Sequence, residues 1–131
     1  MASIVMDAVV AAPAAKVWHG LANVGAAHRV FAGVLSDCRL DDEMVRIVTF
    51  ANGLVIRERI VSVDAELRRI AYTVTGRDFV HHHASMQVLP VGDNECRFIW
   101  ITDVLPDAAA ERIRPLMGAG VAAMQKAFAE R

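Results

Sequence analysis

Asn52-Gly53-Leu54-Val55-Ile56-Arg57-Glu58-Arg59-Ile60 joins a turn to a run in which side chains alternate in character. Asn-Gly favours a tight hairpin turn because glycine adopts the left-handed conformation without strain. The period of two that follows is typical of a β-strand with one buried face, and it places Glu58 on the more apolar face. This stretch therefore predicts an antiparallel hairpin between residues 44–50 and 54–64.

The same alternation extends over most of the chain on both sides of this hairpin. Turn residues separate the alternating runs, and a further run rich in Val and Ile lies near the N-terminus. Pro13 suits the first turn of a short helix over 13–22, and a second short helix is predicted over 28–32. We predict strands at 3–10, 34–41, 44–50, 54–64, 68–75, 79–90 and 95–104.

Helical spacing of apolar residues returns after the last strand. Met117, Val121 and Met124 belong to a stripe that predicts one long amphipathic helix over 107–131, with a kink or restart near Pro115. No repeat or linker divides the chain, so residues 1–131 are predicted to form a single domain. The order of elements predicts an α+β fold, in which a curved seven-stranded antiparallel sheet wraps around the C-terminal helix.

Composition excludes several classes of protein. The 131 residues are 55% hydrophobic and 22% charged, with a net charge of -1 from 14 basic and 15 acidic residues. We expect no nucleic-acid partner, because there is no basic excess to neutralise a phosphate backbone. The uncharged apolar stretches are far shorter than the roughly 18 to 20 residues of a membrane helix, so no membrane association is expected.

Two further features bear on the compartment. The first residues lack the basic segment of a secretory signal, and Asp7 interrupts their apolar run, which favours a cytoplasmic protein. Cys38 and Cys96 are too few for a disulfide scaffold and have no CxxC spacing, so we predict reduced thiols in the core.

Six segments occur in an order and spacing that is more specific than any one of them. They are the stretch 52–60 quoted above, together with Ala12-Pro13-Ala14-Ala15-Lys16-Val17-Trp18, Val45-Arg46, Val63-Asp64, Leu67-Arg68-Arg69-Ile70-Ala71-Tyr72 and Phe98-Ile99-Trp100. Together these segments resemble the START-like superfamily, also called Bet v 1-like or SRPBCC, and within it the polyketide cyclase/dehydrase and lipid transport family. The resemblance covers essentially the whole chain.

The resemblance implies the helix-grip fold with an internal pocket. Members of the superfamily include cyclases, dehydratases, lipid carriers, plant hormone receptors and Hsp90-activators. In the hormone receptors and in alkaloid-forming plant enzymes, the Glu that matches Glu58 faces the pocket. Because one fold serves so many functions, the chemistry must be argued from the residues themselves.

Alternation places four polar side chains on the inner face of the predicted sheet, namely Arg46, Glu58, Tyr72 and His82. We expect Arg46 beside Glu58, Glu58 beside Tyr72, and Tyr72 beside His82, with the row continuing to Thr102. With about 4.8 Å between strands, Glu58 and His82 would lie on the order of 10 Å apart. A small ligand could occupy that gap.

The first of these pairings follows from the length of the hairpin loop. A three-residue loop over 51–53, with Gly53 in the left-handed conformation, pairs Phe50 with Leu54 and therefore Arg46 with Glu58. A two-residue turn would instead align the apolar faces badly.

This row permits general acid/base chemistry on a carbonyl compound. Glu58 is a candidate base or acid, and His82 is the complementary group. Arg46 can hold an anion, and Tyr72 can donate a hydrogen bond to a carbonyl oxygen. Cyclisation, dehydration or isomerisation needs a base at an acidic carbon and a donor at the developing enolate oxygen. The alternative is structural, with Arg46 and Glu58 forming a buried ion pair inside a polar network.

The remainder of the predicted pocket wall is apolar. His81 and His83 share the outer face without a third ligand nearby, so we expect no metal, and no other cofactor is expected. We predict ligand contacts from the inward strand residues and the helix stripe: Phe50, Ile56, Met86, Phe98, Trp100, Met117, Val121 and Met124. A homodimer interface is a further hypothesis, drawn from outward apolar residues: Val45, Ile47, Val55, Ile99 and Ile101.

These observations leave three functions open. The leading hypothesis is a pocket for a small hydrophobic or aromatic carbonyl compound, with turnover by a cofactor-independent cyclase or dehydratase of the lyase or isomerase type. The second is a non-catalytic carrier or sensor of lipid-like molecules. The third is an Hsp90-activator-like interaction module, which should have a filled interior.

Overall fold

The computed structural model of the chain describes residues 2–74, 76 and 78–129. One antiparallel sheet has the strand order β1-β7-β6-β5-β4-β3-β2. Its strands are β1 (Ala2–Val10), β2 (Leu35–Asp42), β3 (Val45–Phe50), β4 (Val55–Asp64), β5 (Arg69–Val74), β6 (His81–Pro90) and β7 (Cys96–Leu105). The helices are α1 (Ala14–Ala22), α2 (Ala27–Val30) and α3 (Ala110–Ala129), with 3₁₀ turns η1 (Val24–Ala26) and η2 (Asp107–Ala109). The predicted α+β helix-grip fold is confirmed.

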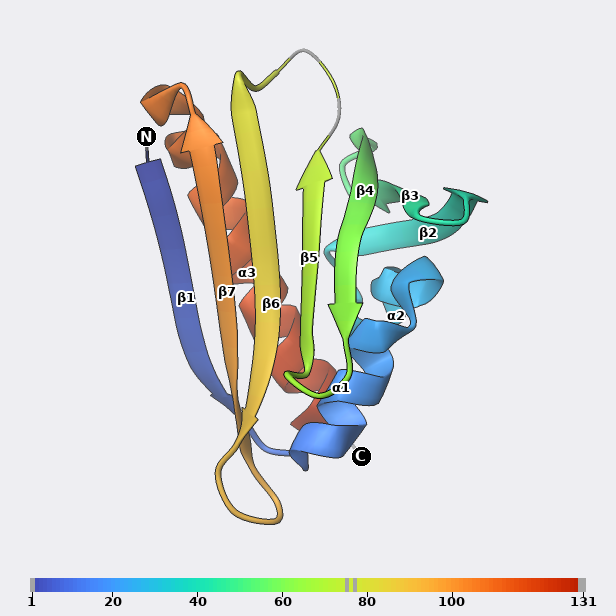
Figure 1. Cartoon of the computed structure of the whole chain (residues 1–131), viewed down its shortest axis with the longest axis vertical. Helices are drawn as coiled ribbons and strands as arrows, with labels where there is room; N and C mark the ends of the chain where they lie inside the picture. The colour runs from blue at the N-terminus through green and yellow to red at the C-terminus, as the bar shows by residue number, and fades with distance from the viewer. Residues whose placement is uncertain (1, 75, 77, 130–131) are drawn as a thin grey trace.

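The sheet curves around α3, which crosses behind β6 and β7, while α1 and α2 cover its other end (Figure 1). Pro13 precedes α1 as its N-cap residue, and α1 buries Val17 and Leu21 on one face. Pro115 lies inside α3, which continues unbroken past it from residue 110 to residue 129, so the predicted restart is wrong. No helix in the described part of the chain is long and apolar enough to cross a membrane.

The pairing of β3 with β4 matches the predicted register. Arg46 lies opposite Glu58, and the Phe50 amide donates to the Leu54 carbonyl at 2.8 Å. Gly53 has a φ of 91°, in the left-handed region that the three-residue loop requires. The hairpin that decides the fold is therefore formed as the sequence predicts.

The two following registers were predicted wrongly. Tyr72 lies opposite Ile60 and Ala84 rather than Glu58 and His82. An irregularity between Ile60 and Ser62 adds a residue to β4, and the Glu58 partner on β5 is Val74. Each predicted partner is displaced by two residues along its strand, from 58 to 60 and from 82 to 84. Because side chains alternate with a period of two, the displaced residues keep the predicted inner face.

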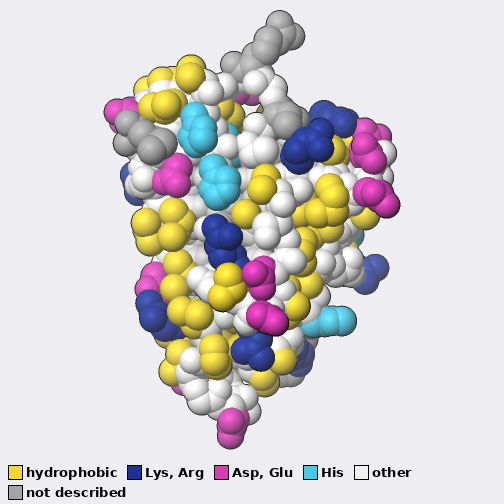
Figure 2. All heavy atoms as spheres, viewed as in Figure 1, with side chains coloured by type: hydrophobic (Ala, Val, Ile, Leu, Met, Phe, Trp, Pro, Cys, Tyr) yellow, Lys and Arg dark blue, Asp and Glu magenta, His cyan; other side chains and the backbone are white. Residues whose placement is uncertain are grey.

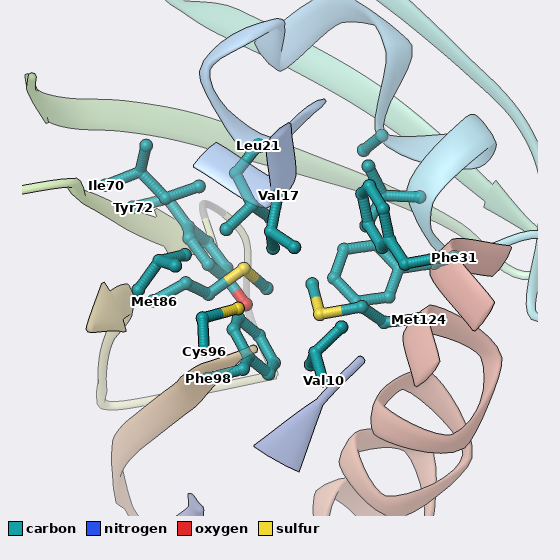
Figure 3. Close-up of a cluster of buried hydrophobic side chains, with 14 of the residues drawn as sticks. Val10, Val17, Leu21, Phe31, Ile70, Tyr72, Met86, Cys96, Phe98 and Met124 are labelled. Carbon is teal, nitrogen blue, oxygen red and sulfur yellow. The ribbon is translucent and has the colours of Figure 1, made fainter. Parts of the chain in front are cut away.

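One half of the inner face packs into a filled hydrophobic core (Figure 3). Val10, Val17, Phe98 and Met124 have at most 1% of their surface exposed, and they draw β1, α1, β7 and α3 together. Both cysteines are buried there as free thiols, in agreement with the prediction. Burial of this apolar area is the main source of stability.

The outer face of the sheet carries scattered apolar side chains among charged ones (Figure 2). Val5 and Val55 are well exposed, with 59% and 56% of their surface accessible. Val45 and Ile47, which the homodimer hypothesis placed on this face as exposed, are buried. Ile47 lies between the cross-strand neighbours Arg39 and Arg57, whose long aliphatic stems can cover it.

Candidate functional site

The other half of the inner face is hollow. A cavity of about 270 Å³ lies between the sheet, the α2 corner and the first half of α3. This volume lies just below the usual range for small-molecule sites, about 300 to 1,000 Å³, so the cavity is sized for a small compound. Its wall contains the following residues: Ala27, Phe31, Val34, Leu35, Arg46, Val48, Phe50, Leu54, Ile56, Glu58, Tyr72, Val74, Asp78, Phe79, His82, Met86, Trp100, Thr102, Arg112, Ile113, Leu116, Met117 and Gly120.

All four predicted polar residues line this cavity, and so do five of the predicted apolar ones: Phe50, Ile56, Met86, Trp100 and Met117. Phe98, Val121 and Met124 are absent from its wall. Phe98 and Met124 are fully buried in the filled core, and Val121 packs against that core. Periodicity identified the inner face correctly, but it could not tell the filled half from the hollow half.

Arg46 and Glu58 form a buried ion pair across β3 and β4. The Arg46 Nε donates to Glu58 Oε1 at 2.8 Å, and only 4% and 12% of the two side chains are exposed. Arg46 Nη1 donates to the Val24 carbonyl of η1 at 3.3 Å, and the Tyr72 ring lies 5.2 Å from the guanidinium carbon. Burial is the largest single influence and lowers the pKa of Arg46, but the charge and hydrogen bond of Glu58, together with Tyr72 and Cys38, outweigh it and the pKa is raised. The guanidinium is thus already neutralised by the protein.

Tyr72 presents its hydroxyl in a dry part of the wall. The indole Nε1 of Trp100 donates to the Tyr72 hydroxyl oxygen at 3.1 Å. Burial, and then the nearby Glu58 carboxylate, raise the pKa of Tyr72, so the phenol keeps its proton. A protonated hydroxyl that accepts from Trp100 has its own hydrogen left to donate.

His82 is held as a neutral ring with a defined tautomer. Its Nδ1 accepts the Val74 backbone amide at 3.1 Å, so the ring proton is on Nε2. Burial, and then the neighbouring His83 and His81, lower the pKa of His82 to about 4. Because a backbone amide occupies its basic nitrogen, His82 is equipped to donate a hydrogen bond rather than to accept a proton.

Beside the cavity, the regular backbone pairing of β5 with β6 ends at Tyr72 and Ala84, and side-chain hydrogen bonds of His82 and Thr73 connect the two strands beyond that point. The Thr73 hydroxyl donates to the His82 carbonyl at 2.5 Å. Val74 joins the two ends of the polar row, since it pairs with Glu58 on one side and bonds His82 on the other. Glu58 and His82 are therefore still two strands apart, with Val74 between them instead of Tyr72.

Sequence reasoning missed part of the wall. Phe79 lines the cavity and its ring lies 5.0 Å from that of His82. In the predicted strand 79–90, alternation would place Val80 on the inner face with His82, but Val80 is 82% exposed. The cause is that β6 begins at His81, so strand alternation does not apply to 79 and 80. Phe31, which follows α2, and Arg112 of α3 were also missed, because the approach of these helical segments to the sheet is a tertiary feature.

Within the described residues, no group of three or more His, Cys, Asp or Glu side chains is arranged to hold a metal ion. His81 is exposed on the outer face, as predicted.

Comparison with known proteins gives a family for this fold and cavity. The family model described as polyketide cyclase / dehydrase and lipid transport matches residues 1–131. The chain belongs to this family. No protein with a curated description matches the sequence of this family member.

Solved structures of similar shape include enzymes. A protein from Thermobifida fusca, solved by NMR in solution, is 26% identical with a TM-score of 0.81, over 99% of this chain and 95% of that one. The di-domain ARO/CYC BexL from the BE-7585A biosynthetic pathway is 17% identical with a TM-score of 0.84, over 99% of this chain and 47% of that one. Truncated norcoclaurine synthase from Thalictrum flavum is 20% identical with a TM-score of 0.73, over 97% of this chain and 90% of that one. These likenesses support the fold of this polyketide cyclase/dehydrase family member.

Proposed function

We propose that this protein binds a small, neutral, hydrophobic or aromatic carbonyl compound in the cavity and moves a proton at the carbon next to the carbonyl. The observation that carries the proposal is the set of polar groups in an otherwise apolar wall. Glu58 is a carboxylate, and Tyr72 and His82 are neutral hydrogen-bond donors. The family, described as polyketide cyclase / dehydrase and lipid transport, and the similar structures of the ARO/CYC BexL and norcoclaurine synthase are consistent with such a ligand.

The ligand is proposed to be neutral because the buried charges already balance. Arg46 is engaged by Glu58 and by the Val24 carbonyl, and the other two charged residues of the described wall, Asp78 and Arg112, are exposed and of opposite sign. The described wall therefore has no buried, uncompensated positive charge to repay the desolvation of a carboxylate. Arg46 then orients Glu58 instead of holding an anion.

The proposed step is an enolisation. The Glu58 carboxylate takes a proton from the carbon next to the carbonyl, and the electron pair of that C–H bond moves onto the carbonyl oxygen. Hydrogen bonds from Tyr72, and from Nε2 of His82, stabilise the developing enolate oxygen. Return of the proton to carbon reverses the step. In cyclisation the enolate carbon attacks a second carbonyl, whose oxygen takes the proton from Glu58. In dehydration a hydroxyl on the next carbon takes that proton and leaves as water. No cofactor is needed for the enolisation.

Deuterium exchange tests this step without knowledge of the natural ligand. The probe is 2-acetylnaphthalene, whose methyl protons exchange with D₂O only through its enol or enolate, and mass spectrometry or NMR follows the exchange. We expect the protein to accelerate exchange and Glu58→Gln to lower the acceleration by at least about 100-fold, the usual contribution of a general base. Glu66→Gln, at an exposed carboxylate in the β4–β5 turn, is the matched control and should exchange as the wild type does.

Tyr72→Phe provides a second variant that does not disturb the ion pair. It should slow exchange while leaving the protein folded. Binding of the probe without any acceleration by the wild type would reject the catalytic proposal in favour of the carrier or sensor function. If 2-acetylnaphthalene does not bind at all, as followed by the fluorescence of Trp100 in a Trp18→Phe variant that keeps it as the single tryptophan, the carbonyl ligand itself is rejected.

The carrier alternative is favoured by one observation, the ion pair itself, since a buried pair satisfied by its own partners also serves to orient a ligand without turnover. The interaction-module alternative predicts a filled interior, and the cavity of about 270 Å³ does not favour it. The cytoplasmic location and the homodimer remain predictions.

A further inference from the structure

Trp100 occupies a tight slot beside Tyr72. Its half-buried indole packs against α3 at Gly120, where an added Cβ would lie 2.9 Å from the Trp100 Cζ3 atom and 3.3 Å from Cη2. Real Cβ atoms do not approach a neighbour so closely, and the rigid indole has no flexible end to move aside. The absence of a side chain at position 120 is therefore what allows the indole to lie in this place.

Two more aromatic rings fix the indole from other sides. The Phe31 ring lies 5.6 Å from the Trp100 ring, and the Phe98 ring lies 6.0 Å from it, both tilted. A Cβ at position 120 would also come within 3.5 Å of Phe31 Cδ1. The indole thus has packing partners from α3, β7 and the segment after α2, and its Nε1 is directed at the Tyr72 hydroxyl 3.1 Å away.

An indole N–H can only donate, which sets the direction of this hydrogen bond. The Tyr72 hydroxyl must accept from Trp100, and its own proton must point elsewhere. Among the described residues, no acceptor for that proton lies within hydrogen-bonding distance, and the Tyr72 side chain lines the cavity. The proton is therefore available to whatever occupies the cavity.

We propose that Trp100, seated in the slot at Gly120, is a positioning residue that makes Tyr72 a one-way hydrogen-bond donor to the ligand. The ligand atom beside Tyr72 must then be a hydrogen-bond acceptor, which the carbonyl oxygen of the proposed ligand supplies, and its recognition depends on Gly120 of α3 through the position of Trp100. This inference rests on the proposed carbonyl ligand for its last step only. The orientation of the Tyr72 hydroxyl can be tested without any ligand.

The test uses the fact that the chain has a single tyrosine. Tyrosine labelled with ¹³C at Cζ therefore gives one NMR signal, which reports the hydrogen bonding of Tyr72 directly. Trp100→Phe removes the indole N–H and keeps an aromatic ring, whereas Gly120→Ala adds the obstructing Cβ. We expect both variants to shift the Tyr72 Cζ signal, and Gly120→Ala to shift the Trp100 indole N–H signal as well.

Gly118→Ala is the matched control, because it lies one half-turn away on the same helix and an added Cβ there meets nothing within 4 Å. It should leave both signals unmoved and raise the midpoint of thermal unfolding, since alanine favours the helix over glycine. In the Trp100→Phe background, Gly120→Ala should have little further effect on the Tyr72 signal, because the smaller ring leaves room for the methyl group. A purely structural role of Gly120 in α3 would give the same shift in both backgrounds.

Ligand binding completes the test with two probes of nearly the same shape. 2-Acetylnaphthalene has an acceptor oxygen, and 2-ethylnaphthalene has none. Trp100→Phe and Gly120→Ala should lower the affinity for the ketone more than the affinity for the hydrocarbon. The difference should be roughly three- to tenfold, which corresponds to one hydrogen bond. An unmoved Tyr72 signal in both variants would overturn the inference. If instead the signals shift as expected but the wild type binds both probes equally, the proposed carbonyl ligand is wrong while the relay from Trp100 to Tyr72 stands.

Discussion

The filled half and the hollow half of the interior lie on the same face of one sheet, yet they contribute in different ways. Around Phe98 and Met124 the sheet is packed against α1 and α3 with apolar side chains only. Around Glu58 the same face holds a buried ion pair, a phenol and a neutral imidazole next to empty space. The difference teaches that stability and binding are separable here. Burying the polar groups of the cavity wall costs free energy of folding, and the apolar packing of the filled half must offset that cost.

The largest effect is expected from breaking the filled half. Met124→Ala removes a fully buried side chain from the core and should lower the free energy of unfolding by about 2 to 5 kcal/mol, through lost burial and the cavity left behind. Urea unfolding followed by circular dichroism measures the loss. The folded fraction should still bind 2-acetylnaphthalene, so a loss of affinity as large as the loss of stability would contradict the separation of the two halves.

The next effect is expected from the ion pair of the hollow half. Arg46→Met leaves the Glu58 carboxylate buried without its partner and should cost about 2 to 3 kcal/mol, toward the low side because Glu58 retains access to the cavity. Replacing both residues, as Arg46→Met with Glu58→Leu, should recover most of that stability while abolishing deuterium exchange. A double variant as unstable as the single one would mean that the pair is required for folding.

A smaller effect is expected from pH. The pKa of His82 is lowered to about 4 by burial and its neighbours, whereas an unfolded histidine titrates near 6.5. Between these values the unfolded chain binds a proton that the folded chain does not. His82 therefore contributes stability above pH 6.5 that is lost as the pH falls toward 4, on the order of 1 to 2 kcal/mol after allowance for solvent screening.

His82→Asn should flatten this dependence of the unfolding free energy between pH 7 and pH 4.5, because the amide oxygen can accept from Val74 without titrating. His81→Asn, on the exposed outer face, is the control that should retain it. Equal slopes in the two variants would assign the pH dependence to other groups.

The smallest effect is expected on the outer face, which belongs to neither half. Val5→Ser removes an exposed methyl pair and should change the unfolding free energy by no more than about 0.5 kcal/mol. Sedimentation of the wild type and of this variant also tests the homodimer hypothesis. If the wild type is a dimer and Val5→Ser is not, the dimer uses this face.

The two hairpins around β4 explain how much could be predicted from the sequence. The β3–β4 register follows from the turn at Gly53, where a single loop length satisfies both the turn chemistry and the apolar faces. The β4–β5 register depends on an irregularity after Ile60 and on Arg68, a non-glycine residue with a φ of 50°, and neither has a clear sequence signal. The residues of the inner face were nevertheless predicted correctly, because each register error is two residues and side chains alternate with a period of two.

Contacts between distant elements were beyond prediction for a different reason. Alternation predicts that Trp100 and Tyr72 lie on the inner face, but their hydrogen bond depends on the space at Gly120 in a separate helix. The boundary of the cavity likewise depends on where α3 approaches the sheet, which periodicity does not contain. The polar wall was therefore predictable residue by residue, whereas its geometry was not.

Because β1 pairs with β7, it can complete its place in the sheet only after β7 has been synthesised. These neighbouring strands are separated by most of the chain, and their contacts include the Ser3 hydroxyl bond to Asp103 and the ion pair of Asp7 with Arg97. During synthesis, at about 5 to 20 residues per second, β1 must wait several seconds before its partner leaves the ribosome. Contacts so distant in sequence also place folding toward the slow end for a domain of this size. Strand β1 is thus among the last to be secured, and until then Ile4 and Val10, which are buried in the folded protein, are open to chaperones and to other unfinished chains.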